Sequence, residues 1–178
     1  MRKTVNAMDY ASELVKALPK GVLLTARDGD KVNPMTIGWG TIGVEWGRPI
    51  FIAFVREHRY TRELLDKNPE FTVNVPLDGC DPKILAVCGT KSGRNLDKVA
   101  ELTLTPVESE VVSVPGFREL PLTLECRVIY RQAQEIPAIA EPWRTKYYPQ
   151  DVPGDFPGSN QDYHIAYYGE IVNAYIAE

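Results

Sequence analysis

The 178-residue chain has little of the side-chain chemistry that identifies many classes of enzyme. It contains two histidines and three cysteines, and their positions show none of the spacings typical of a zinc site. The cysteines are odd in number and widely spaced, which suits reduced thiols better than a disulfide framework. No G-x-S-x-G sequence is present, so the nucleophile elbow of the α/β-hydrolases is also excluded.

Long hydrophobic runs and an excess of basic residues are also missing. The longest apolar stretches, such as "PIFIAFV", are too short to cross a bilayer. The N-terminal sequence has no apolar run followed by a small-residue cleavage site, so it does not resemble a signal peptide. The formal net charge of −4 gives no support for nucleic-acid binding. We therefore expect a cytoplasmic protein without membrane or nucleic-acid partners.

The hydrophobic pattern predicts one domain, residues 1–178, made mainly of strands. At 44% hydrophobic residues the chain can bury one sizeable core. Strands and helices do not alternate regularly, which disfavours a doubly wound parallel sheet and favours a closed or partly closed antiparallel barrel with helices at its rim. The expected elements are a helix capped by Asn6 and ended by Pro19, a hairpin at Asp28-Gly29, a strand buried on both faces at 49–57, a helix at 61–67, an alternating strand at 70–76, a helix from Pro82 to about Cys88, a short helix at 95–100, a half-buried strand at 121–132, and one or two strands at 162–177 broken at Gly169. The proline-rich segment 137–160 is predicted to be a long irregular loop, of the kind that is functional or packed against a partner.

The segment "GWGTIG" matches the G-x-G-x-x-G spacing of dinucleotide-binding domains at Gly38, Gly40 and Gly43. That motif requires a helix after the last glycine, whereas the residues that follow predict a turn and then a strand. Two interpretations remain equally open. Either the bare backbone lies against a flat ligand, or the glycines allow a bend in a barrel.

Two further segments carry groups that bind phosphate. Arg56, His58 and Arg59 precede a helix predicted to start near Thr61, and a helix N-terminus attracts anions. The alternative is a solvated turn with Thr61 as an ordinary N-cap. The segment "CGTKSGR" lacks the G-K-[ST] sequence of a P-loop, so it is either a second phosphate clamp or a surface turn.

Two other reactive side chains are assigned structural roles. Cys88 has no nearby histidine in the sequence and is expected to be a small buried residue. His164 lies inside a predicted strand and is expected to be a packed histidine rather than a base.

Taken together, the blocks "NPMTIGWGTIGVEWGRPIFIAFVREHRYTRELLDKNPEFTVNVP", "CGTKSGR" and "HIAYYGEIVNAYI" resemble the flavin reductase-like, FMN-binding split-barrel family over residues 21–177. The resemblance implies a mainly β, α+β fold: a Greek-key split β-barrel with short flanking helices. It also implies a homodimer that holds FMN noncovalently near the subunit interface. By the same resemblance, Met35, Thr36, Ile37, Gly38, Trp39 and Gly40 line the isoalloxazine ring, Arg56, His58, Arg59, Tyr60 and Thr61 approach the ribityl phosphate, and Lys91 and Ser92 close on it.

The activity implied by this resemblance is that of an FMN-binding oxidoreductase of the flavin reductase type. It would pass electrons from NAD(P)H through bound FMN to a small-molecule or protein acceptor, without a metal or a dedicated catalytic acid or base. One alternative is a flavoredoxin-like FMN electron carrier that acts with a partner protein and does not itself oxidise NAD(P)H. Another is a flavin-free binding module on the same barrel. The loop 137–160, with its aromatic side chains, is predicted to join the dimer surface.

Overall fold

A computed structural model describes residues 2–154 and 159–178 of the chain. Its strands are β1 (Arg2–Thr4), β2 (Val22–Asp28), β3 (Lys31–Ile37), β4 (Gly40–Glu45), β5 (Arg48–Arg56), β6 (Glu70–Val75), β7 (Pro106–Val107), β8 (Gly116–Phe117), β9 (Leu122–Ala133) and β10 (His164–Ala177). Its α-helices are α1 (Ala11–Ala17), α2 (Tyr60–Lys67), α3 (Pro82–Thr90), α4 (Lys98–Glu101) and α5 (Glu141–Tyr147), with 3₁₀ turns at Ala7–Tyr10, Leu18–Lys20 and Ile136–Ala138.

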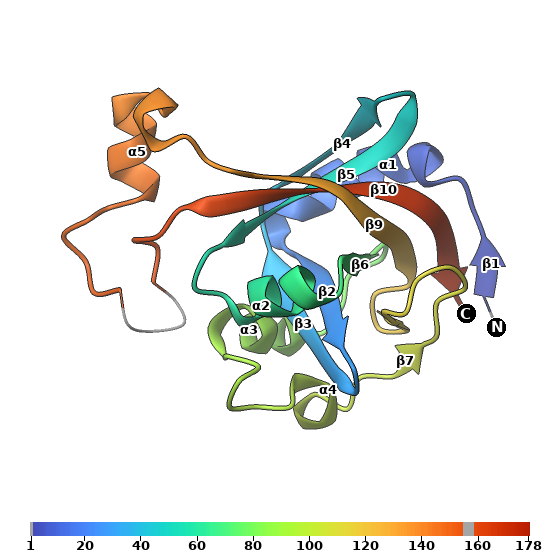
Figure 1. The fold of residues 1–178 in the computed structure, drawn as a ribbon. Helices are drawn as coiled ribbons and strands as arrows, with labels where there is room; N and C mark the ends of the chain where they lie inside the picture. The colour runs from blue at the N-terminus through green and yellow to red at the C-terminus, as the bar shows by residue number, and fades with distance from the viewer. Residues whose placement is uncertain (1, 155–158) are drawn as a thin grey trace.

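Eight of the strands form one antiparallel sheet in the order β3-β2-β6-β9-β10-β5-β4, with β1 added beside β10. The long strands β9 and β10 curve across the molecule, while α2, α3 and α4 lie together near β2 and β3 (Figure 1). The edge strands β3 and β4 are not hydrogen-bonded to each other among the described residues, so the barrel is split rather than closed. The predicted mainly β split barrel with short flanking helices is confirmed.

The turns and helix starts follow the local sequence signals. Gly29 has a φ of +56° in the tight turn between β2 and β3, as the Asp28-Gly29 pair predicts. Between β4 and β5, Trp46 and Gly47 both have positive φ, the geometry of a two-residue hairpin turn. The side chains of Asn6 and Asp81 accept hydrogen bonds from the backbone of the helical segments that they cap.

Strand β6 is confirmed as a strand, and both of its faces are buried although its apolar and polar residues alternate. Thr72 and Asn74 have no exposed surface, and the Thr72 hydroxyl donates a 2.8 Å hydrogen bond to the carbonyl of Pro115. Asn74 donates a 2.9 Å hydrogen bond to the hydroxyl of Thr123 on β9. The segment that carries β7 and β8 therefore covers a face that the alternating pattern assigns to solvent.

Three further boundaries differ from expectation. Strand β10 runs through Gly169 without a break, and only its pairing with β9 shifts register there. Strand β9 is buried at its start, but its second half, including Tyr130, is largely exposed. The segment 137–160 is not irregular throughout, because it contains the helix α5, and residues 155–158 lie outside the described part of the chain.

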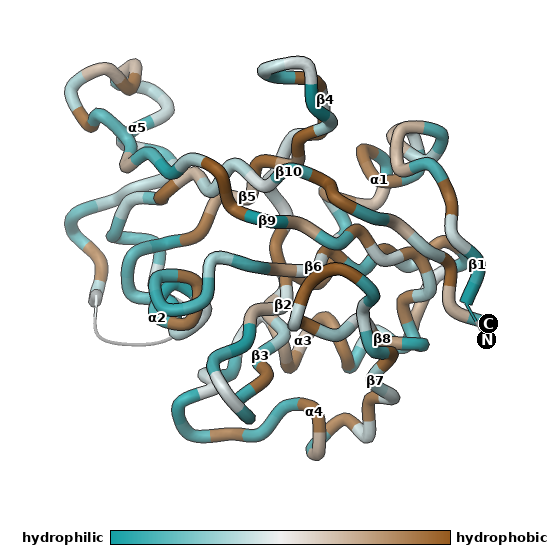
Figure 2. Tube along the Cα trace, turned by 45° about the vertical axis from the view of Figure 1, so that its right-hand side comes forward, coloured by the Kyte–Doolittle hydropathy of each residue, from teal (hydrophilic) through white to brown (hydrophobic). Residues whose placement is uncertain are grey.

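The hydrophobic core has two parts. The larger one includes Phe51, Leu64, Phe71 and Tyr167, from three strands and from α2. The smaller one, which includes Ile84, packs α3 against β2 and the segment after α4. In Figure 2, hydrophobic stretches lie along the strands, and hydrophilic ones lie on α2 and on the chain leading into α4. Within the described residues, no helix has both the length and the apolar character needed to cross a membrane.

Candidate functional site

A cavity of about 430 Å³ lies at the N-terminal end of α2. Three segments that are distant in the sequence meet there: β3, the start of α2, and the chain between α3 and α4. The predicted site residues that line this cavity are Met35, His58, Arg59, Tyr60, Thr61, Lys91 and Ser92.

The start of α2 has no side-chain cap. Arg59 occupies the N-cap position, and its side chain makes no capping hydrogen bond. Thr61 lies inside the helix and is 1% exposed, so the alternative in which it is an ordinary N-cap is wrong. Its hydroxyl accepts a 2.9 Å hydrogen bond from the Asn33 amide and donates to the Met35 sulfur at 3.4 Å. The helix end, with its positive dipole, therefore lies at the cavity without a side-chain cap, and Glu63 is the acidic residue of its first turn.

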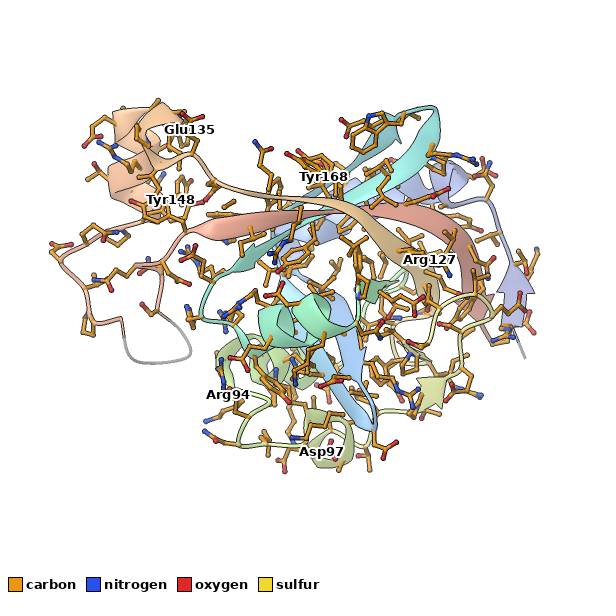
Figure 3. All side chains as sticks on the ribbon, viewed as in Figure 1. Arg94, Asp97, Arg127, Glu135, Tyr148 and Tyr168 are labelled. Atoms are coloured by element: carbon orange, nitrogen blue, oxygen red, sulfur yellow. The ribbon has the colours of Figure 1, made fainter. Side chains whose placement is uncertain are left out.

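Two arginines bring positive charge to the same cavity. Arg59 donates a 3.1 Å hydrogen bond to the carbonyl of Gly89, and burial, followed by the charge of nearby Arg56, lowers its pKa from the usual value. Arg94 lies on the chain between α3 and α4 (Figure 3), and its guanidinium is 5.5 Å from the centre of the Tyr60 ring. Arg94 also donates to a carboxylate oxygen of Glu63.

Lys98 and Asn33 line the cavity too, although neither is among the predicted site residues. Lys98 is 3% exposed, and its ammonium donates to the carbonyls of Pro34 at 2.9 Å and Cys88 at 3.3 Å. Burial lowers the pKa of Lys98 to about 8. The one feature of the sequence that could have pointed to Lys98 is its position directly after the capping residue Asp97. This position lies in the first turn of a helix, which restricts the direction of the side chain.

A second, smaller cavity adjoins the first. Its volume is about 170 Å³, and it shares Met35 and Arg59 with the first cavity. The backbone from Met35 to Trp39 forms one side, and Phe54, Arg56 and His164 contribute the rest. The segment 35–40 was predicted to line a flat ring, and all of its residues except Gly40 line this cavity. Gly40 lies in a more open hollow on the far side of Trp39.

The three glycines of the "GWGTIG" segment differ in how much space a side chain would have at each position. A Cβ on Gly40 would lie 3.2 Å from the backbone oxygen of Ile52 and would clash with the Phe51 ring, so packing requires glycine there. A Cβ on Gly38 would meet only the Leu18 oxygen at 3.5 Å, an ordinary contact, and one on Gly43 would meet nothing. Close packing therefore requires glycine at position 40, and the space beside Gly38 remains available to a ligand.

Arg56 lies beside the second cavity and not the first. Its guanidinium donates to the carbonyls of Tyr147 at 3.1 Å, Asn160 at 2.9 Å and Asp162. It also lies 6.0 Å from the centre of the Trp39 ring. The structure thus brings the other predicted phosphate residues together and places Arg56 apart from them, where it holds the segment after α5 against the sheet.

Two ionisable groups near Arg56 are fixed in one protonation state. His58 Nδ1 lies 2.7 Å from a carboxylate oxygen of Asp162. Burial alone would raise the pKa of Asp162, but hydrogen bonds from His58 and the charge of Arg56 hold that pKa below its usual value. His164 is buried 2.9 Å from the Tyr148 hydroxyl, and burial and the charge of Arg56 lower its pKa to about 3. His164 is therefore a neutral, packed histidine, as predicted.

Cys88 is also inert, as predicted. It has no exposed surface, and burial raises the pKa of its thiol to about 11.

The two cavities share Met35 and Arg59, and we refer to them together as the groove. The buried Oδ1 atom of Asn33, a residue that lines the first cavity, has no hydrogen-bond partner among the described residues. A Cβ on Gly93 would collide with this oxygen and would come within 2.9 Å of the Tyr60 ring. The groove therefore fits a ligand with a flat apolar part, hydroxyl donors in the middle and an anionic group at the far end, which is the chemistry of FMN.

Known proteins resemble this chain over most of its length. The family model described as "Flavin reductase like domain" matches residues 15–178. A protein of Archaeoglobus fulgidus described as uncharacterized is 34% identical over 127 residues, which are 71% of this chain and 67% of that protein.

Two solved structures show the same fold. Flavoredoxin from Methanosarcina acetivorans superposes with a TM-score of 0.64 at 28% identity, over 89% of this chain and 68% of that one. Nitrilotriacetate monooxygenase component B from Bacillus cereus superposes with a TM-score of 0.62 at 20% identity, over 98% and 78% of the two chains.

Proposed function

This chain belongs to the flavin reductase-like family, and we propose that it binds FMN in the groove and acts as an oxidoreductase of the flavin reductase type. The observation that carries the proposal is the groove itself. A cationic cavity at an uncapped helix start adjoins a cavity with exposed strand backbone, and an unpaired buried acceptor lies in the first of them.

Each part of the groove would hold one part of FMN. The start of α2, Arg59, Lys91 and Ser92 would bind the phosphate. Asn33 Oδ1 would accept a hydrogen bond from a ribityl hydroxyl, which would satisfy that oxygen. The backbone from Met35 to Trp39 would lie along the ring.

When bound, FMN would supply the transfer of two electrons from NAD(P)H to an acceptor. The chain's own residues would set the surroundings of that exchange. Arg56 and Arg59 place positive charge beside the ring cavity and would stabilise negative charge there. Trp39 and Phe54 line the same cavity, and neutral His164 adds no competing charge.

The visible absorption spectrum of the purified protein, with and without added FMN, tests cofactor binding. We expect a flavin spectrum and one FMN per chain. A colourless protein that takes up no FMN would refute this function and the carrier function described next.

The alternative function is an FMN electron carrier that meets a partner protein. It is supported by the similarity to flavoredoxin from Methanosarcina acetivorans at 28% identity. Anaerobic stopped-flow mixing of the FMN-loaded protein with NADH and with NADPH separates the two functions. Rapid bleaching of the flavin absorbance with either nucleotide supports the reductase, and slow or absent bleaching supports the carrier.

A homodimer is proposed on the basis of an uncovered face of the sheet. Thr41, Ile52, Tyr168 and Tyr130 form one row across β4, β5, β10 and β9. Trp46 is 61% exposed at the tip of the β4–β5 hairpin, and its ring lies 6.2 Å from that of Tyr130 and 6.4 Å from that of Tyr168. Such clustered aromatic side chains are enriched in protein interfaces.

Helix α5 is proposed to extend this dimer surface. Its Trp143 is 58% exposed and stacks on Tyr147, which in turn meets Trp39 edge-on at the ring cavity. The aromatic residues of α5 thus connect the exposed surface to the groove.

A further inference from the structure

Lys98 is a buried cation that the described residues do not neutralise. Its side chain extends from α4 beneath β3 and α3, and no carboxylate of the described residues lies within 4.0 Å of its ammonium. The two carbonyls that it contacts, of Pro34 and Cys88, take two of its three N–H donors.

The surroundings of Lys98 oppose its positive charge. Burial removes water from the ammonium, and the charge of Arg59 also disfavours it, whereas the Cys88 side chain acts in the opposite direction. A buried ammonium with one donor left and a cationic neighbour is stabilised by an anion. Lys98 and the start of α2 line the same cavity. An anion bound at the helix start would therefore lie in the cavity that the buried Lys98 also lines.

We propose that Lys98 binds the phosphate of the flavin cofactor from the buried side of the cavity, opposite the helix end. This inference rests on the proposed binding of FMN and adds a phosphate ligand that lies outside the recognisable motifs. Lys91, Ser92 and Arg94 reach the cavity from the exposed chain between α3 and α4. Lys98 comes from the core side, where its charge is not screened by solvent.

A purely structural role would explain some of the same contacts. By bonding to Pro34 on β3 and to Cys88 on α3, Lys98 joins two elements of the cavity wall. The two roles differ in their dependence on the phosphate. Riboflavin has the same ring and ribityl chain as FMN but no phosphate, so a phosphate ligand affects FMN alone and a structural residue affects both molecules.

The experiment compares the dissociation constants of FMN and riboflavin for the wild-type protein and for Lys98→Met, measured by flavin fluorescence titration. Methionine keeps the unbranched apolar stem and removes the charge and the donors. We expect Lys98→Met to weaken FMN binding about 10- to 100-fold, the size of a lost hydrogen bond to a charged group, and to leave riboflavin binding unchanged.

Two control variants accompany this one. Asn33→Ala is expected to weaken both flavins equally, because its oxygen faces the ribityl chain that both contain. Lys67→Met removes an exposed lysine that pairs with Asp28 and is expected to change neither. The inference would be overturned if Lys98→Met weakened the binding of FMN and riboflavin equally, or left the affinity for FMN unchanged. Failure of the wild-type protein to bind FMN would instead overturn the proposed function.

If Lys98→Met does not fold, the wild-type protein still tests the inference through pH. The titratable group on α3 that faces Lys98 is Cys88, and Arg59 faces it from α2. Lys91, Arg94 and His58 are the other charged or titratable groups lining the cavity. The ratio of FMN to riboflavin affinity is expected to fall at least 10-fold between pH 7 and pH 9.5 as Lys98 loses its proton. A constant ratio would contradict the assignment.

Discussion

Raising the pH is expected to stabilise the flavin-free protein through Lys98. Burial lowers the pKa of this lysine from 10.5 to about 8, so the folded protein gives up the proton at a lower pH than the unfolded chain does. Below pH 8 both states are protonated, and the full cost of the buried charge is present. Between pH 8 and pH 10.5 the unfolded chain binds more protons, so the free energy of unfolding increases with pH.

The size of this effect follows from the two pKa values. Their difference of about 2.5 pH units corresponds to about 3.4 kcal/mol over the whole range. About 2 kcal/mol of that amount falls between pH 7 and pH 9.5, because most of the titration of the folded protein is complete there.

The assay is urea denaturation of the wild-type protein and of Lys98→Met at pH 7 and pH 9.5. Other groups titrate in both proteins, so the difference between the two pH dependences isolates Lys98. We expect the wild-type protein to gain about 2 kcal/mol relative to the variant on going to the higher pH. Identical pH dependences would refute the assignment of a buried, charged Lys98. Bound FMN is expected to abolish the gain, because the phosphate holds the proton on the lysine.

Three further predictions concern packing, the groove and assembly. Gly169→Ala places a Cβ 2.9 Å from the Cβ of Cys126 and against the buried Phe71 ring. It is expected to lower the free energy of unfolding, measured in urea, by about 1–3 kcal/mol. The control Gly43→Ala places its Cβ in open space and is expected to change this free energy little. Gly93→Ala places a Cβ that collides with Asn33 Oδ1, so it is expected to displace Asn33 and weaken FMN binding at least 10-fold in a fluorescence titration. An unchanged FMN affinity would show that the ligand lies elsewhere. Trp46→Arg is expected to shift the protein from dimer to monomer in light scattering at micromolar concentration, and a dimer that persists would exclude the aromatic face as the interface.

The elements that the sequence predicts well are those set by local chemistry. The Asp28-Gly29 turn and the capping residues Asn6 and Asp81 act within a few residues of themselves, and each has its predicted role. Helix α5 was not predicted because the surrounding prolines resemble a loop signal. Pro142, however, lies in the first turn of that helix, where a missing N–H costs nothing.

The features that were not predictable arise from contacts between distant segments. Burial of Thr72 and Asn74 depends on the chain around Pro115, which no pattern within β6 reveals. Arg56 lies close in the sequence to the residues predicted to bind the phosphate. It is the last residue of β5, however, where it pairs with His164 of β10. Its guanidinium donates hydrogen bonds to backbone carbonyls of Tyr147 and Asn160.

The groove itself was only partly predictable, for the same reason. The motif residues Arg59, Tyr60 and Thr61 are contiguous, so their position at one helix start follows from the sequence. Asn33 and Lys98 reach the cavity from β3 and α4, and their burial depends on how these elements pack. Local motifs therefore identify residues such as Arg59 and Thr61, and they miss Asn33 and Lys98, which packing brings to the same cavity.

The most direct test of the account is a fluorescence titration of FMN with the wild-type protein and with Arg59→Met, since Arg59 lies between the two cavities of the groove. We predict saturation at one FMN per wild-type chain, and binding at least 10-fold weaker in the variant because a charged donor near the phosphate is lost. The absence of saturable binding to the wild-type protein, or equal affinities for the two proteins, would contradict the claim that this groove is a flavin site.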